Sequence, residues 1–141
     1  MIDISSLEKA IEQLETSLNY LASPLAQNDG GIAKQFRAAA IQAFEFTYEL
    51  SHKMLKRYLE DTDPSPETID ELDFQGLVRT GFERGLLLHS WNEWRAYRKA
   101  RGTTSHSYDE TSAEEVLKQI PEFLDEAKFL RDAINKRQEG A

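Results

Sequence analysis

Apolar residues recur along this chain at alternating steps of three and four, which is the spacing of one face of an α-helix. The first such seam is Leu7, Ile11, Leu14, Leu18, Leu21 and Leu25. No stretch alternates between apolar and polar residues as a half-buried strand does, and nothing repeats internally. Because amphipathic helices bury their seams by packing against one another, the sequence predicts an all-α fold.

Turn and capping signals divide the first half of the chain into two helices. Ser5-Ser6-Leu7-Glu8 has the pattern of a capping box with Ser5 as the N-cap, and Asn28-Asp29-Gly30-Gly31 breaks the first seam. The inner face of the second helix is expected at Phe36, Ala40, Phe44, Thr47, Leu50, Met54, Tyr58 and Leu59. This helix should end in the loop at residues 61–66.

The second half predicts a split third helix and a long fourth one. Ser65 is expected to cap the third helix, with Pro66 at its first position. Its inner face would be Ile69, Leu72, Phe74, Leu77, Val78 and Phe82. Gly81 and Gly85 predict a kink or break near Gly85, so residues 91–100 would form a continuation or a separate short helix.

The last helix is expected to be capped by Thr111 or Ser112, with Pro121 kinking it slightly. Its inner face would be Val116, Ile120, Phe123, Leu124, Ala127, Leu130 and Ile134. The sequence therefore predicts one domain over residues 1–141, an antiparallel up-and-down four-helix bundle whose third helix is split.

Length and composition limit the number of domains, the available cysteine chemistry and the expected cellular location. Its 141 residues suit a single domain, and the absence of cysteine excludes disulfides, thiolate metal sites and a cysteine nucleophile. The beginning of the chain lacks the pattern of a signal peptide, and no apolar run approaches the roughly 20 residues of a membrane span. We therefore expect a cytoplasmic protein that does not enter the membrane.

Charge is unevenly distributed along the chain. The formal net charge is −8, which argues against broad coating of nucleic acid. Residues 79–101 nevertheless contain six basic side chains and only two acidic ones. This stretch is either a solvated helix face that pairs with acidic neighbours or a local site for anions.

The run Arg101-Gly102-Thr103-Thr104-Ser105-His106-Ser107-Tyr108 follows this basic stretch and is expected to form a polar loop. Arginine matches phosphate with its planar fork, and histidine transfers protons near neutral pH. The pattern therefore suggests metal-independent cleavage of an RNA phosphodiester, in which His106 acts as general base or acid and Arg101 stabilises the charge on the phosphoryl oxygens. The alternative is a helix-capping arginine and a loop histidine bonded to the backbone.

Two neighbouring patterns have competing interpretations. Trp91, Trp94 and Tyr97 alternate with basic residues, an arrangement that can stack bases and hold phosphates but that also describes a packed helix face, which we favour for the tryptophans. The candidate phosphate contacts on this segment are Arg95, Arg98 and Lys99. A metal site at His106, Asp109 and Glu110 is not expected, because no second histidine lies nearby and acidic residues at a helix start usually serve the helix dipole. No cofactor is predicted.

Several segments resemble, in order, the nucleotidyltransferase substrate-binding proteins, which are HEPN-type partners of minimal nucleotidyltransferases. They are residues 41–60, Phe82-Glu83-Arg84-Gly85-Leu86-Leu87, Trp91, and the run from Arg101 to Glu110. The resemblance covers nearly the whole chain. It departs at two positions: Gly102 follows the motif arginine, where asparagine is common, and His52 stands where tryptophan is common.

The resemblance implies a helical homodimer that partners a separate minimal nucleotidyltransferase. It also implies a toxin of a toxin–antitoxin pair, with RNase activity at an Arg-x4-His-x-Tyr signature in which Arg101 and His106 match the catalytic pair. Tyr108 matches a tyrosine that the partner enzyme adenylylates in some pairs, although it could instead be packed on the end of the bundle. The alternative function is a non-catalytic subunit that presents a nucleotide or acceptor substrate to the nucleotidyltransferase.

Overall fold

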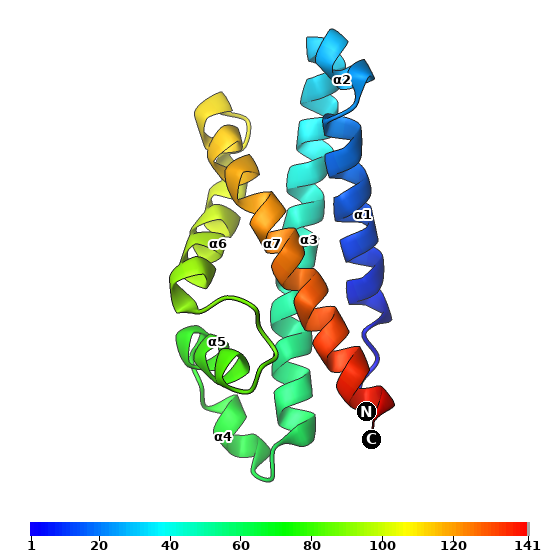
Figure 1. Cartoon of the computed structure of the whole chain (residues 1–141). Coiled ribbons are helices and arrows are strands. Elements are labelled where there is room, and N and C mark those ends of the chain that lie inside the picture. The colour runs from blue at the N-terminus through cyan, green and yellow to red at the C-terminus, as the bar shows by residue number, and fades with distance from the viewer. Residues whose placement is uncertain (141) are drawn as a thin grey trace.

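The computed structural model describes residues 1–140, and every regular element in that range is helical (Figure 1). In chain order the elements are α1 (Ser5–Leu21), α2 (Pro24–Asn28), α3 (Gly30–Thr62), α4 (Pro66–Asp70), α5 (Phe74–Glu83), α6 (Trp91–Thr103), the 3-10 turn η1 (Thr104–His106) and α7 (Glu110–Glu139). None of these helices is long and apolar enough to cross a membrane. The predicted all-α bundle is confirmed.

The 33-residue helix α3 is the centre of the arrangement, and it contacts each of the other helices. Figure 1 shows α1 alongside α3, α7 crossing α3, and the shorter helices α4, α5 and α6 together on the side away from α1. The predicted split of the third helix is thus confirmed, and it goes further than expected because residues 66–103 form three helices. The two described ends of the chain lie together, where the backbone N–H of Ile2 donates to Oε1 of Gln138 at 2.8 Å.

Aromatic side chains form the centre of the core. Phe123 of α7 makes edge-to-face contacts with Phe44 at 5.2 Å and with Tyr97 at 5.2 Å between ring centroids, and with Trp94 at 5.7 Å. Edge-to-face pairs of this kind stabilise a core beyond the area that they bury. Trp94 is only 1% exposed and Tyr97 is fully buried, so the packing role favoured for Trp94 is confirmed.

Three residues of the predicted apolar seams are exposed. Helix α1 ends at Leu21, and Leu25 lies in the short helix α2 with 57% of its surface exposed. Leu72 and Phe82 are also exposed rather than buried, because the chain turns after α4 and α5 ends at Glu83. Periodicity continues through such breaks in the sequence even where the helix does not.

Most predicted helix caps were wrong by position or by residue. Helix α1 begins at Ser5 itself, and the predicted capping box does not form. The Ser5 N–H donates instead to Oδ1 of Asp3. Asp109, rather than Thr111 or Ser112, caps α7, since its Oδ2 accepts from the Ser112 N–H at 3.2 Å.

Three further sequence signals lie at Ser65, Gly85 and Pro121. Ser65 does precede Pro66 at the start of α4, but its side chain makes no capping bond. The break predicted at Gly85 is confirmed, because Gly85 has φ of +76° just after α5, a backbone conformation that favours glycine. Helix α7 continues past Pro121 without interruption.

A buried carboxylate fixes the connection between α5 and α6. Glu126 of α7 is fully buried, and its oxygens accept hydrogen bonds from the Leu88 N–H at 2.7 Å, the His89 N–H at 3.0 Å and Nε1 of Trp94 at 2.6 Å. Burial raises the pKa of Glu126, and the three hydrogen bonds oppose that rise. This contact fixes the start of α6 against α7, and α6 carries the motif arginine at its other end.

Candidate functional site at the tip of the α6–α7 hairpin

The Arg-x4-His-x-Tyr motif lies at the tip of the hairpin formed by α6, η1 and α7, coloured yellow in Figure 1. The expectation of a polar loop is wrong for its first half. Arg101 belongs to the last turn of α6, and Thr104 at the start of η1 is 4% exposed. Helical geometry therefore fixes the backbone of the arginine, and only the residues after His106 form a turn.

Arg101 is held by two elements. Its Nη2 lies 2.5 Å from Oε1 of Glu49 and 4.0 Å from Oε2 of Glu45, both on α3, while its Nη1 donates to the Thr104 hydroxyl at 3.1 Å. The same hydroxyl donates to the Arg101 carbonyl at 2.7 Å. The side chain is 31% exposed, so the guanidinium has a set orientation and still faces solvent in part.

His106 and Tyr108 stand free at the tip. Both side chains are exposed, Tyr108 by 85%, and their ring centroids are 6.3 Å apart. Neither side chain makes a hydrogen bond or an ion pair within residues 1–140, so the alternatives of a backbone-bonded histidine and a buried tyrosine are wrong. No hydrogen bond joins Arg101 to His106 in that range either.

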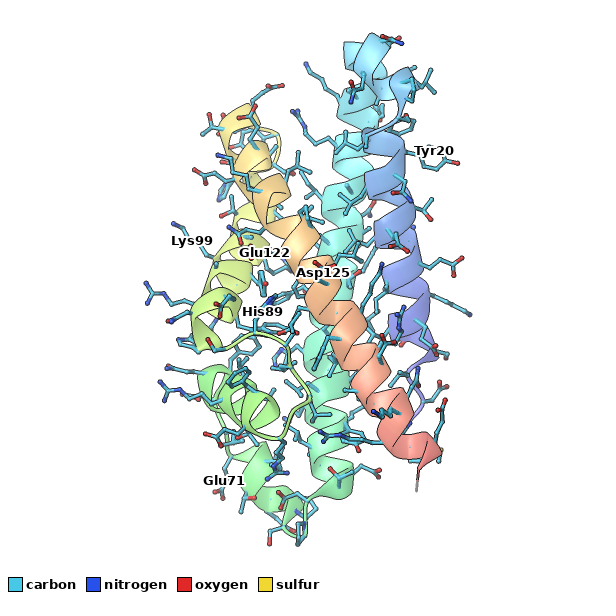
Figure 2. All side chains as sticks on the ribbon, in the orientation of Figure 1. Tyr20, Glu71, His89, Lys99, Glu122 and Asp125 are labelled. Atoms are coloured by element: carbon cyan, nitrogen blue, oxygen red, sulfur yellow. The ribbon has the colours of Figure 1, made fainter. Side chains whose placement is uncertain are left out.

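The basic residues of α6 point in different directions. Arg98 places its guanidinium carbon 5.2 Å from the centre of the Phe74 ring, which is a cation–π contact. Lys99 projects from the outer side of α6 (Figure 2) and lines an open groove of about 270 Å³ with Lys118 of α7. Arg95 is exposed. Arg98 and Lys99 therefore face different neighbours, and the three predicted phosphate contacts do not line one cleft with Arg101.

Electrostatics link Arg98 and Arg101 to the same part of α3. Burial raises the pKa of Tyr48 to about 12, and the positive charges of Arg98 and Arg101 oppose this rise. Tyr48 lies one residue before Glu49, the carboxylate that holds Arg101. Arg98 and Arg101 therefore both lie close enough to Tyr48 to influence its hydroxyl.

The acidic residues after the motif have structural partners. Asp109 caps α7, and Glu110 pairs with Arg37 of α3 at 3.3 Å and lies 4.0 Å from Lys34. Within residues 1–140 no group of three or more histidine or acidic side chains is placed to hold a metal ion. These pairs tie the start of α7 to α3 and so position the hairpin tip.

Sequence reasoning missed three carboxylates that shape the site. Glu45 and Glu49 face Arg101 from more than 50 residues away, and no local pattern announces such a contact. The sequence does indicate that Glu126 is unusual, because this carboxylate lies between Phe123 and Leu130 on the buried face of the last helix. A carboxylate on an apolar seam predicts a paired or hydrogen-bonded buried group.

The fold and the hairpin tip define a class of small all-helical proteins that carry an arginine and an exposed histidine at the end of a helical hairpin. Residues 2–136 match the family described as "Nucleotidyltransferase substrate binding protein like". The chain belongs to this family of nucleotidyltransferase substrate-binding proteins.

Two comparisons, both with Haemophilus influenzae, illustrate the similarity. One is with a relative named probable ribonuclease HepT, which is 36% identical over 134 residues that cover 95% of this chain and 88% of the relative. The other is with a solved structure described as revealing the fold of a substrate binding domain of a nucleotidyltransferase. It superposes with a TM-score of 0.87 and 32% identity, covering 94% of this chain and 99% of the other.

Proposed function

We propose that this chain is the toxin subunit of a HEPN-type toxin–antitoxin pair, and that it is a metal-independent endoribonuclease acting in the cytoplasm. Its partner would be a minimal nucleotidyltransferase that acts as antitoxin. The observation that carries the proposal is the hairpin tip, where an oriented, partly exposed arginine precedes a histidine whose imidazole is free for proton transfer. The name of the relative, probable ribonuclease HepT, supports the same activity.

In this mechanism His106 transfers a proton and Arg101 stabilises negative charge. The 2′-oxygen of a ribose would attack the adjacent phosphorus as the bond to the 5′-oxygen breaks, which leaves a cyclic phosphate and a free 5′-hydroxyl. His106 would take the proton of the 2′-hydroxyl or give a proton to the 5′-oxygen, and Arg101 would bind the negative phosphoryl oxygens. A phosphate reaching Arg101 would take the place of Glu49 on the guanidinium.

A homodimer would complete the site. The reaction needs both an acid and a base, and the tip of one chain offers a single exposed histidine. Two tips facing a shared cleft would supply the second. The mass in solution at micromolar concentration should be twice the 16.2 kDa of the chain, and a clean monomer would contradict the composite site.

Tyr108 would be the point of control. Its 85% exposure makes the hydroxyl accessible to a modifying enzyme, and its ring lies next to that of His106. An adenylyl group there would bring a phosphate that competes with RNA for Arg101 and would also fill the space in front of His106. Incubation with the partner and ATP should add AMP to the wild type but not to Tyr108→Phe, and the modified protein should no longer cleave RNA.

Cleavage of RNA by purified variants tests the activity. Arg101→Ala and His106→Ala should each abolish cleavage, whereas Arg79→Ala, an exposed arginine on α5, should not. Chelator should leave the wild type unaffected. Cleavage that requires a divalent metal, or that survives the loss of His106, would rule out this mechanism.

The alternative is a non-catalytic subunit that binds a nucleotide or acceptor substrate for the nucleotidyltransferase. The family description and the description of the solved relative favour it, and the groove between α6 and α7 has lysines that could hold a phosphate. Expression of the wild type beside Arg101→Ala separates the two. Toxicity that disappears with the arginine supports the RNase, and equal growth supports the binding subunit.

A further inference from the structure

A second groove begins where Arg101 meets α3. It runs along the next turns of α3, has a volume of about 420 Å³, and is lined by Glu49, His52, Lys53, Lys56, Arg57, Glu60 and Asp70. This volume falls within the range of roughly 300–1,000 Å³ that is typical of small-molecule sites. Because Glu49 is also the partner of Arg101, the groove adjoins the proposed catalytic arginine.

The ion pairs of this groove leave two cations available. Lys56 pairs with Asp70 at 3.0 Å, a contact that raises the pKa of the lysine, and Glu49 is taken up by Arg101. Lys53 and Arg57 lie one turn apart on the exposed side of α3, and neither has a carboxylate within 4.0 Å among residues 1–140. Glu60 of the same lining is also without an ion pair among residues 1–140, so the unpaired groups of the groove are two cations and one carboxylate. Their net positive charge favours an anion.

His52 gives the groove an aromatic wall. Its ring is half-buried and meets the Phe74 ring edge-on, with centroids 4.7 Å apart, and Arg98 lies over the same Phe74 ring at 5.2 Å. Burial lowers the pKa of His52, and the positive charges of Lys56 and Arg98 lower it further. A neutral imidazole can stack against a base and can both donate and accept a hydrogen bond.

We infer that this groove is a nucleotide subsite, in which one nucleotide of an RNA strand flanking the cleaved bond places its base against His52 and its phosphate between Lys53 and Arg57. The assignment rests on the proposed RNase function and extends it, because it places the RNA strand along α3 on one side of the cleaved bond. Free cations beside an aromatic side chain are the combination that binds single-stranded nucleic acid with little sequence preference.

Binding and cleavage of short RNAs test the subsite. The test variant is Lys53→Glu with Arg57→Glu, and the control is Lys9→Glu with Lys136→Glu, which has the same net charge but alters exposed lysines on α1 and at the end of α7. Affinity is measured in a His106→Ala background so that the RNA stays intact. Each lost phosphate contact should lower the slope of log affinity against log salt by about one.

Substrate length separates the subsite from the catalytic centre. The groove variant should raise KM for a single-stranded oligonucleotide about tenfold relative to the control variant, a change equivalent to the loss of about 1.4 kcal/mol. It should leave cleavage of a dinucleotide, which spans only the broken bond, unchanged. The imidazole signals of His52 should shift on addition of the oligonucleotide but not of the dinucleotide, and His52→Phe should keep more affinity than His52→Ala.

Each other outcome overturns a defined part of the argument. If the wild type cleaves RNA but the groove and control variants behave alike, the subsite is wrong and the RNase stands. If the wild type neither binds nor cleaves RNA, both fail. If the groove variant binds RNA normally but no longer binds the partner nucleotidyltransferase, the groove docks a protein and the assignment to RNA is wrong.

Discussion

Replacing Glu126 with alanine should destabilise the protein substantially. The carboxylate is fully buried and accepts three N–H groups, from the backbone of Leu88 and His89 and from the Trp94 indole. Removing it leaves these donors without their acceptor. An unsatisfied buried donor costs about 1–3 kcal/mol.

The three costs do not simply add. The backbone groups of Leu88 and His89 are only part-buried, so water can replace some of their lost bonding, whereas the bond to the Trp94 indole is buried. The variant also avoids the burial of a charge, which offsets part of the loss. We expect the free energy of unfolding to fall by about 3 kcal/mol, equivalent to roughly 10 °C in Tm for a chain of this size.

Urea denaturation followed by tryptophan fluorescence measures this change, since Trp94 donates to Glu126 and Trp91 lies one turn earlier on α6. Glu122→Ala is the matched control, because Glu122 is an exposed carboxylate one turn earlier on α7 (Figure 2) and should cost less than about 0.5 kcal/mol. A loss below about 1 kcal/mol for Glu126→Ala, or equal losses for the two variants, would refute the conclusion that this carboxylate secures the α5–α6 connection.

Three further predictions concern stability. Because burial raises the pKa of Glu126, the folded state keeps a proton that the unfolded state releases. The stability of the wild type relative to Glu126→Gln should therefore fall as the pH rises above the ordinary glutamate pKa of about 4.3, and urea denaturation over a series of pH values measures this fall. Gly102→Ala should raise the free energy of unfolding by about 0.5–1 kcal/mol, because Gly102 lies in the last turn of α6 with nothing within 4 Å of an added Cβ; an unchanged or lower Tm would contradict this. Gly85→Ala should lower the free energy of unfolding by about 1 kcal/mol, because φ there is +76° and an added Cβ would lie 3.0 Å from Nη2 of Arg137; thermal melting would show a neutral change if the backbone adapts freely.

Local periodicity was sufficient to predict the helical class and the buried faces of the longest helices. Phe44, Met54, Phe123 and Leu130 are all buried as their spacing predicts. The same signal failed at Leu25, where the chain begins a new short helix and the seam loses its partner. Spacing records which face is apolar, but it does not record where the backbone turns.

The candidate site was only partly accessible to sequence reasoning. The order of Arg101, His106 and Tyr108 could be recognised, and the exposure of the last two follows from the polar residues around them. The contact between Arg101 and Glu49 spans 52 residues and depends on how α6 packs on α3. Such long-range partners follow from tertiary geometry, which a single sequence does not specify.

The buried bond network around Glu126 also bears on the order of assembly. The three donors precede Glu126 by 32 to 38 residues, so the carboxylate must stay hydrated until α7 closes against α6 and the preceding connection. Helix α7 follows the motif directly in the chain, so it leaves the ribosome after the motif. The ties of Glu110 to α3 therefore form only when α7 docks, whereas the contact of Arg101 with Glu49 involves α6 and α3 alone.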